Sequence, residues 1–352
     1  MYKRINFILK LLIKANQNYF SKSQLFYIVE NADWSIKHDG EMITSCLKDS
    51  IVSSISITHY GIRNSIVHYG SIGIFLGQDK IKLPHKSNKI IVTWFHIVPN
   101  DQRVKLLPEA IKHVDIWHTS CQSTKNKMIE LGIPKDKIIV VPLGVDLNYF
   151  KPAICKENIK EELNIPKDKI IIGSFQKDGN GWGEGLEPKL IKGPDIFCEV
   201  VEKLAKKYDI FVLLTGPARG YVKQRLEKAE IPYKHEFFDN PNDVSKYFQA
   251  IDLYMVTSRE EGGPKAILES LASGVPLIST KVGMAPDIIE DGKNGFLVDI
   301  EDIDNLYSKA CEIIDNQDLQ NSFISNGLKT IKKYDWSNIS SQYYKNLYKE
   351  LL

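Results

Sequence analysis

The sequence lacks an excess of charge and a cysteine pattern, and both absences exclude whole classes of protein. Its 46 Lys and Arg residues nearly balance its 44 Asp and Glu residues, so it has no global basic field of the kind that marks a nucleic-acid-binding protein. The five cysteines are scattered and show neither a CxxC pair nor a Cys/His ligand spacing. They are typical of reduced thiols in a cytosolic protein rather than of a disulfide scaffold or a zinc module.

Several catalytic signatures are also missing. There is no P-loop, no DxD motif placed to hold a metal ion, and no order of Ser, His and Asp that indicates a catalytic triad. Glycines recur at positions 179, 181, 183 and 185, but their spacing is wrong for a dinucleotide-binding fingerprint and no helix is expected to begin there. The sequence therefore predicts no metal and no cofactor.

The chain is long enough for two hydrophobic cores. It has 352 residues, of which 43% are hydrophobic and 26% charged, a composition typical of a soluble globular protein. Because a single core rarely serves so long a chain, we expect two domains of about 150 residues each.

The first thirty residues are basic and apolar at once. Lys3, Arg4, Lys10 and Lys14 lie among apolar residues, and no acidic residue precedes Glu30. Lys10 interrupts the apolar run, which is too short to span a bilayer and is followed by no small-residue cleavage site. Two interpretations remain: a cationic amphipathic helix on the inner surface of the membrane, or a helix that packs on its own domain.

Short β-branched or aromatic runs alternate with helical stretches from residue 24 onward, as in parallel sheets with crossover helices. The expected strands are 25–30, 51–58, 66–76, 89–97, 115–120 and 137–143 in the first half, and 169–175, 210–216, 252–258, 275–280 and 295–299 in the second. The expected helices are 108–113, 124–131, 195–208, 222–229, 244–250, 265–273 and 306–314. This pattern predicts two Rossmann-like domains of the α/β class.

The boundary between the domains is predicted in the charged stretch 152–166. We therefore predict a first domain over residues 1–152, a second over residues 153–335, and a C-terminal helix over residues 336–352 that packs back toward the first domain. A cleft between two such domains, outside the carboxyl ends of parallel strands, is where small molecules usually bind.

The segment from residue 252 to residue 299 carries the clearest chemistry. Gly262 and Gly263 permit a tight turn, Pro264 suits the first position of a helix, and Gly274 suits the position just after its end. A helix that begins near Lys265 would offer free N–H groups and a positive dipole end to an anion such as a diphosphate.

Two glutamates flank this turn. Glu261 precedes it and Glu269 follows one helical turn into the helix. A carboxylate suits a diol because each of its oxygens accepts one hydroxyl hydrogen, so Glu261 is a candidate ligand of a sugar and Glu269 of a ribose. The alternative is that Glu269 is an exposed residue paired with Lys265 and that Glu261 is an ordinary first-turn acid.

Together these residues resemble the retaining family-4 glycosyltransferases, whose E-x7-E signature is matched by Glu261 and Glu269. Residues 118–152 also resemble that family's passage between domains, which ends in GVD-x-x-x-F-x-P, and residues 280–299 resemble the loop after the signature. The resemblance is weak before residue 89. It implies the GT-B fold, in which two Rossmann-like domains face each other across a cleft.

The resemblance also implies roles for individual residues. The donor nucleotide would lie in the second domain, with its ribose on Glu269, its diphosphate near residues 262–265 and its sugar on Glu261. Lys192 matches the family's lysine on the diphosphate, whose charge it would offset; the alternative is a solvated lysine at the end of a loop.

The arginine that accompanies this lysine in the family is missing. After Gly173 the chain has Ser174 instead. Ser174 and Lys177 are candidate donor-binding residues, and Gln176 or Lys177 is the candidate substitute for the arginine.

A histidine and a loop complete the candidate site. His96 follows a strand of the first domain and resembles the family's histidine that contacts the donor sugar, although lone histidines are more often structural. The family's glycine pair after the first strand is absent, and residues 31–40 stand in its place as a loop that would shape the acceptor pocket. Residues 176–192 are either a lid in which Trp182 stacks on a sugar, or a mobile loop.

The sequence therefore predicts a metal-independent, retaining glycosyltransferase with Glu261, His96 and Lys192 as catalytic residues. Its donor would be a UDP- or GDP-sugar and its acceptor a glycan or a lipid-linked glycan, without nucleic acid as a partner. We expect the protein in the cytoplasm, with peripheral contact to the inner face of the membrane. The alternatives are a nucleotide-sugar 2-epimerase of similar fold and a non-catalytic GT-B scaffold.

Overall fold

A computed structural model describes residues 2–31, 35–77, 79–98, 100–238 and 240–352. The chain divides into two compact units. The first comprises Met1–Gly144 and Trp336–Leu352, and the second comprises Val145–Asp335. The sequence had placed this boundary at residue 152.

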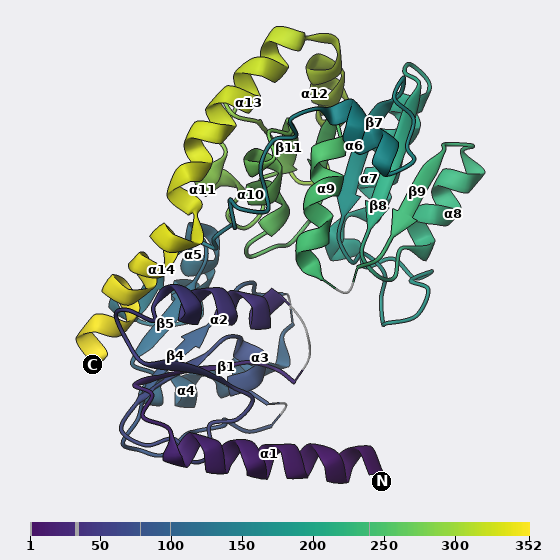
Figure 1. Cartoon of the computed structure of the whole chain (residues 1–352). Coiled ribbons are helices and arrows are strands. Elements are labelled where there is room, and N and C mark those ends of the chain that lie inside the picture. The colour runs from purple at the N-terminus through teal and green to yellow at the C-terminus, as the bar shows by residue number, and fades with distance from the viewer. Residues whose placement is uncertain (1, 32–34, 78, 99, 239) are drawn as a thin grey trace. The chain divides into compact units, whose positions relative to one another are not determined.

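The first unit contains a six-stranded parallel sheet in the order β2-β1-β3-β4-β5-β6. The strands are β1 (Leu25–Ile28), β2 (Ser53–Ser56), β3 (Ile66–Tyr69), β4 (Lys89–Thr93), β5 (Ile116–Thr119) and β6 (Ile138–Val140). Its helices are α1 (Tyr2–Phe20), α2 (Ser35–Cys46), α3 (Ile72–Phe75), α4 (Leu107–His113), α5 (Gln122–Glu130) and α14 (Trp336–Tyr343) (Figure 1). Helix α14 packs on α2.

The second unit contains another six-stranded parallel sheet, in the order β12-β11-β10-β7-β8-β9. The strands are β7 (Ile170–Phe175), β8 (Ile210–Thr215), β9 (Tyr233–Glu236), β10 (Leu253–Val256), β11 (Leu277–Thr280) and β12 (Phe296–Val298). Its helices are α6 (Lys156–Glu162), α7 (Pro194–Ala205), α8 (Gly220–Lys228), α9 (Val244–Ala250), α10 (Lys265–Ala272), α11 (Ala285–Ile288), α12 (Ile303–Asp315) and α13 (Gln317–Ile331).

Strands β1, β3, β8, β10 and β11 are buried along their whole length, as expected of parallel strands covered on both faces. The core of the first unit includes Phe26, Val92 and Trp117, and that of the second includes Ile172 and Val212. The prediction of two Rossmann-like domains with parallel sheets is confirmed.

Four local expectations were wrong. The strand expected over residues 66–76 ends at Tyr69, and α3 follows it after Gly70. The loop expected over residues 31–40 contains the start of α2, while residues 32–34 lie outside the described residues. The charged stretch 152–166 includes α6, and the polar edge strand β9 was missed. For α2, α6 and β9 the apolar pattern was too weak to reveal an element that tertiary packing stabilises. Residues 66–76, in contrast, form a nearly continuous apolar run that includes both the strand and the short helix.

A chain of buried polar side chains links three strands of the first sheet to the C-terminal segment. The Tyr348 hydroxyl lies 2.8 Å from Nδ1 of His68, and His68 Nε2 lies 2.7 Å from Oγ1 of Thr93. Thr93 Oγ1 lies 2.9 Å from Nδ1 of His118, whose Nε2 lies 3.0 Å from the carbonyl oxygen of Val141. Because that carbonyl only accepts, the chain is satisfied when Nε2 of each histidine donates and Nδ1 of each accepts, so both imidazoles are neutral.

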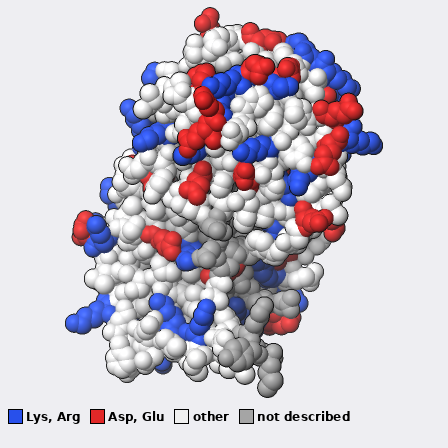
Figure 2. Space-filling model, turned by 45° about the vertical axis from the view of Figure 1, so that its right-hand side comes forward, with Lys and Arg blue, Asp and Glu red and all other residues white. Residues whose placement is uncertain are grey.

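Acidic and basic side chains are interspersed on the face shown in Figure 2, in keeping with the nearly balanced charge of the sequence. Among the described residues, no helix combines the length and the hydropathy needed to cross a bilayer.

Candidate functional site

The turn between β10 and α10 packs against the loop between β11 and α11. Gly283 has a φ of +51°, and a Cβ atom there would lie 2.4 Å from the carbonyl oxygen of Gly262 and 2.8 Å from that of Glu261. Only glycine permits so close an approach of the two backbones. The helix begins at Lys265 as expected, but Pro264 lies just before it rather than at its first position.

Lys192 and Glu261 meet directly. Lys192 Nζ lies 2.5 Å from Oε1 of Glu261, which also accepts a hydrogen bond of 3.1 Å from the Ser258 hydroxyl. The two side chains are only 23% and 11% exposed. The sequence singled out both residues, but the contact between them joins positions 69 residues apart.

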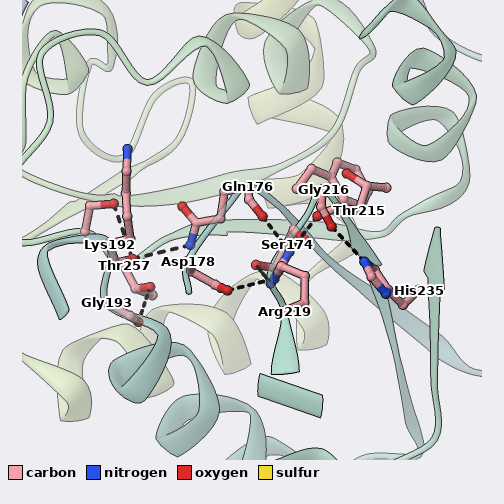
Figure 3. Close-up of polar contacts among 12 residues, drawn as sticks. Ser174, Gln176, Asp178, Lys192, Gly193, Thr215, Gly216, Arg219, His235 and Thr257 are labelled. Atoms are coloured by element: carbon pink, nitrogen blue, oxygen red, sulfur yellow. Dashed lines mark hydrogen bonds and ion pairs between the residues drawn. The ribbon is translucent and has the colours of Figure 1, made fainter. Parts of the chain in front are cut away.

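Backbone contacts fix the position of Lys192. It ends a short 3-10 turn, Leu190–Lys192, and the Ile191 carbonyl accepts hydrogen bonds from the N–H groups of Arg259 (2.9 Å) and Glu260 (3.1 Å). The next residue, Gly193, has a φ of +64°, and a Cβ atom there would lie 1.9 Å from the carbonyl oxygen of Thr257. The Thr257 hydroxyl donates to the Gly193 carbonyl at 2.8 Å (Figure 3).

A buried tyrosine lies near both signature glutamates. The N–H of Phe175 donates to the Tyr254 hydroxyl at 3.2 Å. Burial raises the pKa of Tyr254, and the carboxylates of Glu269 and Glu261 raise this pKa further, so both acids lie within electrostatic reach of one phenol. The structure thus brings Glu261 and Glu269 to the carboxyl end of β10, next to the end of β7.

Ser174 binds an arginine that the sequence pattern did not reveal. The guanidinium of Arg219, just before α8, donates to the Ser174 carbonyl at 2.6 Å and to the Ser174 hydroxyl at 2.9 Å (Figure 3). It also donates to the carbonyls of Gln176 and Thr215. Its Nε lies 2.9 Å from a carboxylate oxygen of Asp178, and both side chains are fully buried.

Arg219 therefore takes a structural role at this end of the sheet. Its donors are directed at carbonyls, a hydroxyl and Asp178, which fastens the segment after β7 to the loop after β8. Burial raises the pKa of Asp178, and the charge of Arg219 opposes that rise. Ser174 is itself 1% exposed, and its hydroxyl faces this arginine.

A third lysine joins Lys177 and Lys192 at the site. Lys189 is half-buried, and its backbone N–H donates to the Asp178 carbonyl at 2.7 Å. Burial lowers the pKa of Lys189, the charges of Lys192 and Lys177 lower this pKa further, and Glu261 opposes them. Lys189 is therefore within electrostatic reach of Lys192, Lys177 and Glu261. Lys189 was missed because it matches no motif; its place three residues before Lys192 was the available signal.

The segment 176–192 folds as a hairpin tied to the start of α8. Gly179 bridges Pro188 in antiparallel fashion. The N–H of Gly220 donates to the Glu184 carbonyl at 2.7 Å, and that of Tyr221 donates to the Gly185 carbonyl at 2.9 Å. Near the tip, Lys177 Nζ lies 3.6 Å from the centre of the Trp182 ring, which is 65% exposed.

His96 belongs to the first unit, while the other candidate residues belong to the second. It follows the carboxyl end of β4, as expected, and its side chain is exposed. Burial raises the pKa of Asp101, whereas Arg103 and, to a smaller extent, the charge of His96 lower this pKa.

Comparisons with known proteins find similarity to glycosyltransferases. Residues 156–330 match the family model described as glycosyl transferases group 1. The chain is 25% identical over 265 residues to the UDP-Gal:alpha-D-GlcNAc-diphosphoundecaprenol alpha-1,3-galactosyltransferase of Escherichia coli, a match that covers 71% of this chain and 63% of that protein. It is 24% identical to the lipopolysaccharide core biosynthesis mannosyltransferase LpsB of Rhizobium meliloti, with 55% of each chain covered. The matches span 41 to 63% of the length of the first curated relatives.

Solved structures share the fold over more than nine-tenths of the chain. HepE of Anabaena in complex with UDP-glucose has a TM-score of 0.75 at 15% identity, with 92% of this chain and 99% of that chain covered. A glycosyltransferase of Rickettsia africae has a TM-score of 0.70 at 18% identity, with 94% and 99% covered. The predicted GT-B fold is therefore confirmed.

Proposed function

We propose that the protein transfers a sugar from a nucleotide-diphosphate donor to a glycan or lipid-linked acceptor, as the match of residues 156–330 to the glycosyl transferases group 1 family model supports. Transfer proceeds with retention of configuration and without a metal ion. The acceptor hydroxyl then approaches the face from which the diphosphate departs.

The contact between Lys192 and Glu261 carries this proposal. A buried or half-buried ion pair beside a helix start is a place where one ligand can engage both partners: a diphosphate for the ammonium, and hydroxyl groups for the carboxylate. Because Gly193 and Gly283 fix the two backbones that bear this pair, its geometry is set before any ligand binds. Such preorganisation favours stabilisation of charge that develops in a transition state.

The lysines take the place of a metal ion in this mechanism. The departing diphosphate gains negative charge, which Lys192, Lys189 and the N–H groups at the start of α10 offset. Lys189 thereby supplies the second cation for which the sequence offered Gln176 or Lys177. Glu269 accepts hydrogen bonds from the ribose, and Glu261 accepts them from the donor sugar. His96 is proposed to contact the same sugar.

The relatives support the substrate classes. The curated names include a transferase that uses UDP-galactose and a diphosphoundecaprenol-linked acceptor, and a mannosyltransferase of lipopolysaccharide core biosynthesis. We propose that this protein acts in the cytoplasm, at the inner face of the membrane, in the synthesis of an envelope glycan.

Removal of Lys192 tests the proposal most directly. In a transfer assay with radiolabelled nucleotide-sugars, Lys192→Ala should lower kcat by roughly 100-fold or more, because one preorganised charge contact with the transition state is lost. Lys203→Ala is the matched control, since Lys203 pairs with Asp304 on the surface of α7. Equal turnover of wild type and Lys192→Ala would refute the proposed role.

Substitutions of Glu261 and Glu269 should have different kinetic effects. Glu261→Ala should abolish transfer, whereas Glu269→Ala should mainly weaken nucleotide binding and raise KM. Glu312→Ala, which alters an exposed pair with Lys309 on α12, should change neither quantity. If the Glu269→Ala variant bound UDP as tightly as the wild-type protein, Glu269 would not be a ligand of the ribose.

Two other functions make different predictions. A 2-epimerase would convert the nucleotide-sugar in the absence of an acceptor, which product analysis after incubation of the donor alone would reveal. A non-catalytic scaffold would bind no nucleotide or nucleotide-sugar in calorimetry. Lys192, Glu261 and Glu269 all lie in one small region, and this convergence favours the transferase.

A further inference from the structure

Arg259 connects the two segments that carry Lys192 and Glu261. It lies two residues before Glu261, in the turn that follows β10. Its Nη1 donates to the Leu190 carbonyl at 2.7 Å, and its backbone N–H donates to the Ile191 carbonyl at 2.9 Å. These two carbonyls belong to the 3-10 turn that Lys192 ends. A single residue therefore holds that turn through its side chain and through its backbone.

An aspartate fixes the orientation of the Arg259 guanidinium. Nη1 and Nη2 of Arg259 lie 2.8 Å and 2.7 Å from the two carboxylate oxygens of Asp195, which is in the first turn of α7. Burial raises the pKa of Asp195, but the hydrogen bonds and the charge of Arg259 lower this pKa by more, so the carboxylate is ionised at neutral pH. Two parallel bonds to one carboxylate fix the direction of a guanidinium as well as its position.

The remaining side of the guanidinium is also engaged. Nε of Arg259 lies 2.5 Å from Oε1 of Glu301, just after β12. All three nitrogens of the guanidinium thus have protein acceptors, and the carboxylates of Asp195 and Glu301 offset its charge. Its donors are directed at the protein, so Arg259 is suited to ordering the site rather than to holding a substrate anion.

The turn that carries Lys192 depends on contacts from outside. It is a 3-10 turn of three residues, Leu190–Lys192, and such short turns have poor hydrogen-bond geometry of their own. Among the described hydrogen bonds that reach its backbone from the segment after β10, the two from Arg259 are shorter than those from Glu260 (3.1 Å) and Ser258 (3.4 Å). Arg259 is therefore the main tie between this turn and the segment that bears the signature glutamate.

We propose that Arg259 is a positioning residue for sugar transfer, because it holds the turn of Lys192 so that the ammonium stays against Glu261, where the diphosphate of the donor binds. The proposal rests on the proposed function, and it adds the residue that sets the position of that function's main cation. A shift of about 1 Å in a group that acts on the reacting atoms can lower a rate by roughly 100-fold. Loss of Arg259 should therefore slow transfer even though its guanidinium touches no substrate.

The reactivity of Lys192 toward acetic anhydride tests the positioning without any substrate. Limited acetylation of the full chain, followed by mass spectrometry of its peptides, measures each lysine separately. Lys192 is 23% exposed and paired with Glu261, so it should react slowly in the wild-type protein. In Arg259→Ala its reactivity should rise by about tenfold relative to that of Lys203, because hydrogen bonds from a charged group no longer keep the turn closed.

Arg225→Ala is the matched control for this measurement. Arg225 forms a two-bond pair with Glu202 at 2.8 Å and 2.9 Å, and its side chain is 29% exposed, close to the 26% of Arg259. Because Arg225 joins α8 to α7 away from the turn, its loss should leave the reactivity of Lys192 unchanged. Equal reactivity of Lys192 in the wild-type protein and in Arg259→Ala would overturn the proposal.

A second variant and an internal reference separate positioning from loss of the fold. Lys160 is 5% exposed in the same unit, and its Nζ lies 3.3 Å from Asp252, so its low reactivity reports an intact unit. Arg259→Lys keeps the charge but not the planar two-bond geometry, so Lys192 should become more reactive in it while Lys160 does not. A parallel rise at Lys160 and Lys192 in both Arg259 variants would show general loosening and would overturn the positioning role.

Kinetics of transfer then show whether Arg259 acts through Lys192. Arg259→Ala should lower kcat by at least about tenfold and change the donor KM less, since the contact of Lys192 with developing charge is disturbed. In a Lys192→Ala background the same substitution should lower kcat little further, because residues that act through one another give non-additive losses. Losses in kcat that multiply independently would overturn the link to Lys192.

The wild-type protein and the variants decide separate questions. UDP binding and sugar transfer by the wild-type protein decide the proposed function, whereas the difference between Arg259→Ala and Arg225→Ala decides the positioning role. Transfer by the wild-type protein, with equal kcat in these two variants, would overturn the positioning role alone. A wild-type protein that neither binds UDP nor transfers sugar would overturn the proposed function, and the role of Arg259 in transfer with it.

Discussion

At the scale of single residues, glycine and arginine decide how the candidate site is built. Gly193 lets the backbone after Lys192 pass against the Thr257 carbonyl, and Arg219 fastens the segment that follows β7. Neither residue carries a motif of its own. Both act by fixing the backbone from which Lys192 and Lys189 extend.

Substitution of Gly193 should destabilise the protein. Gly193→Ala places a Cβ atom in the left-handed region and 1.9 Å from a carbonyl oxygen, so we expect a loss of about 2 kcal/mol or more in the free energy of unfolding. Gly181→Ala is a matched control, since Gly181 has a φ of +69° but no atom within 4 Å of its Cβ position. It should lose only about 1 kcal/mol, and equal losses in urea denaturation would show that the Thr257 contact relaxes freely.

Substitution of Arg219 should destabilise the protein more than substitution of an ordinary surface arginine. Arg219→Ala leaves Asp178 buried without its partner, so we expect about 3–5 kcal/mol of destabilisation. Arg225→Ala breaks a pair with Glu202 in which both side chains are 29% exposed, and it should lose no more than about 1 kcal/mol. A double variant, Arg219→Met/Asp178→Asn, should recover part of the loss. If Arg219→Ala were as stable as Arg225→Ala, the ion pair would have no structural role.

At the scale of elements, α1 shows that a helix can be predicted correctly while its orientation is not. The sequence left open whether this basic segment lies on a membrane or packs on its own domain. The structure shows packing through Asn18 and small residues, together with an exposed apolar stripe formed by Ile5, Ile8, Leu9 and Leu12. The polar face of α1 therefore packs on its own domain, as one interpretation expected, while its apolar face remains exposed.

The buried amide should hold α1 on the first unit. Asn18→Ala leaves the Thr58 and Tyr60 carbonyls without this donor, so we expect the local opening of α1 to become easier by about 1–3 kcal/mol. Hydrogen exchange of the α1 amides measures this opening directly. Asn16→Ala, at an exposed position of the same helix, should leave the exchange unchanged. Equal protection in both variants would mean that apolar contacts alone retain the helix.

At the scale of the whole molecule, the buried histidine chain makes stability depend on pH. Burial lowers the pKa of His118 to about 4. Burial, together with the smaller repulsion that a protonated His118 would exert, lowers the pKa of His68 well below its usual value. The unfolded chain protonates these histidines near pH 6.5, whereas the folded chain resists protonation until the pH falls much lower. The unfolded state thus binds more protons in this window, and stability falls as the pH drops below about 6.5.

The size of this effect can be measured by urea denaturation between pH 7 and pH 4.5. Each such histidine should contribute a loss of about 1.4 kcal/mol per pH unit below 6.5. His118→Gln should reduce the slope of unfolding free energy against pH, while His85→Gln, at an exposed position, should not. Burial also lowers the pKa of His59 and of His235, so part of the slope should remain in the His118 variant. An unchanged slope would place the pH dependence in other groups.

The sequence by itself determined the class of fold and most of the elements. Alternating apolar runs and helical stretches predicted two parallel sheets because each pattern depends on near neighbours in the chain, which the sequence displays directly. The glycines and proline before Lys265 located the start of α10 for the same reason, and Glu261, Glu269 and Lys192 were found through a motif. Elements without apolar periodicity, such as β9 and α6, did not give this local signal.

Only the tertiary structure decided which distant groups meet. The contacts of Lys192 with Glu261, of Arg219 with Ser174, and of α1 with the loop after β2 join residues far apart in the chain. These contacts depend on strand order, because β7 lies between β10 and β8 although it precedes both in sequence. No local pattern encodes that neighbourhood. The physical reason is that packing of non-consecutive strands, and not propensity, sets where the charges of this protein come together.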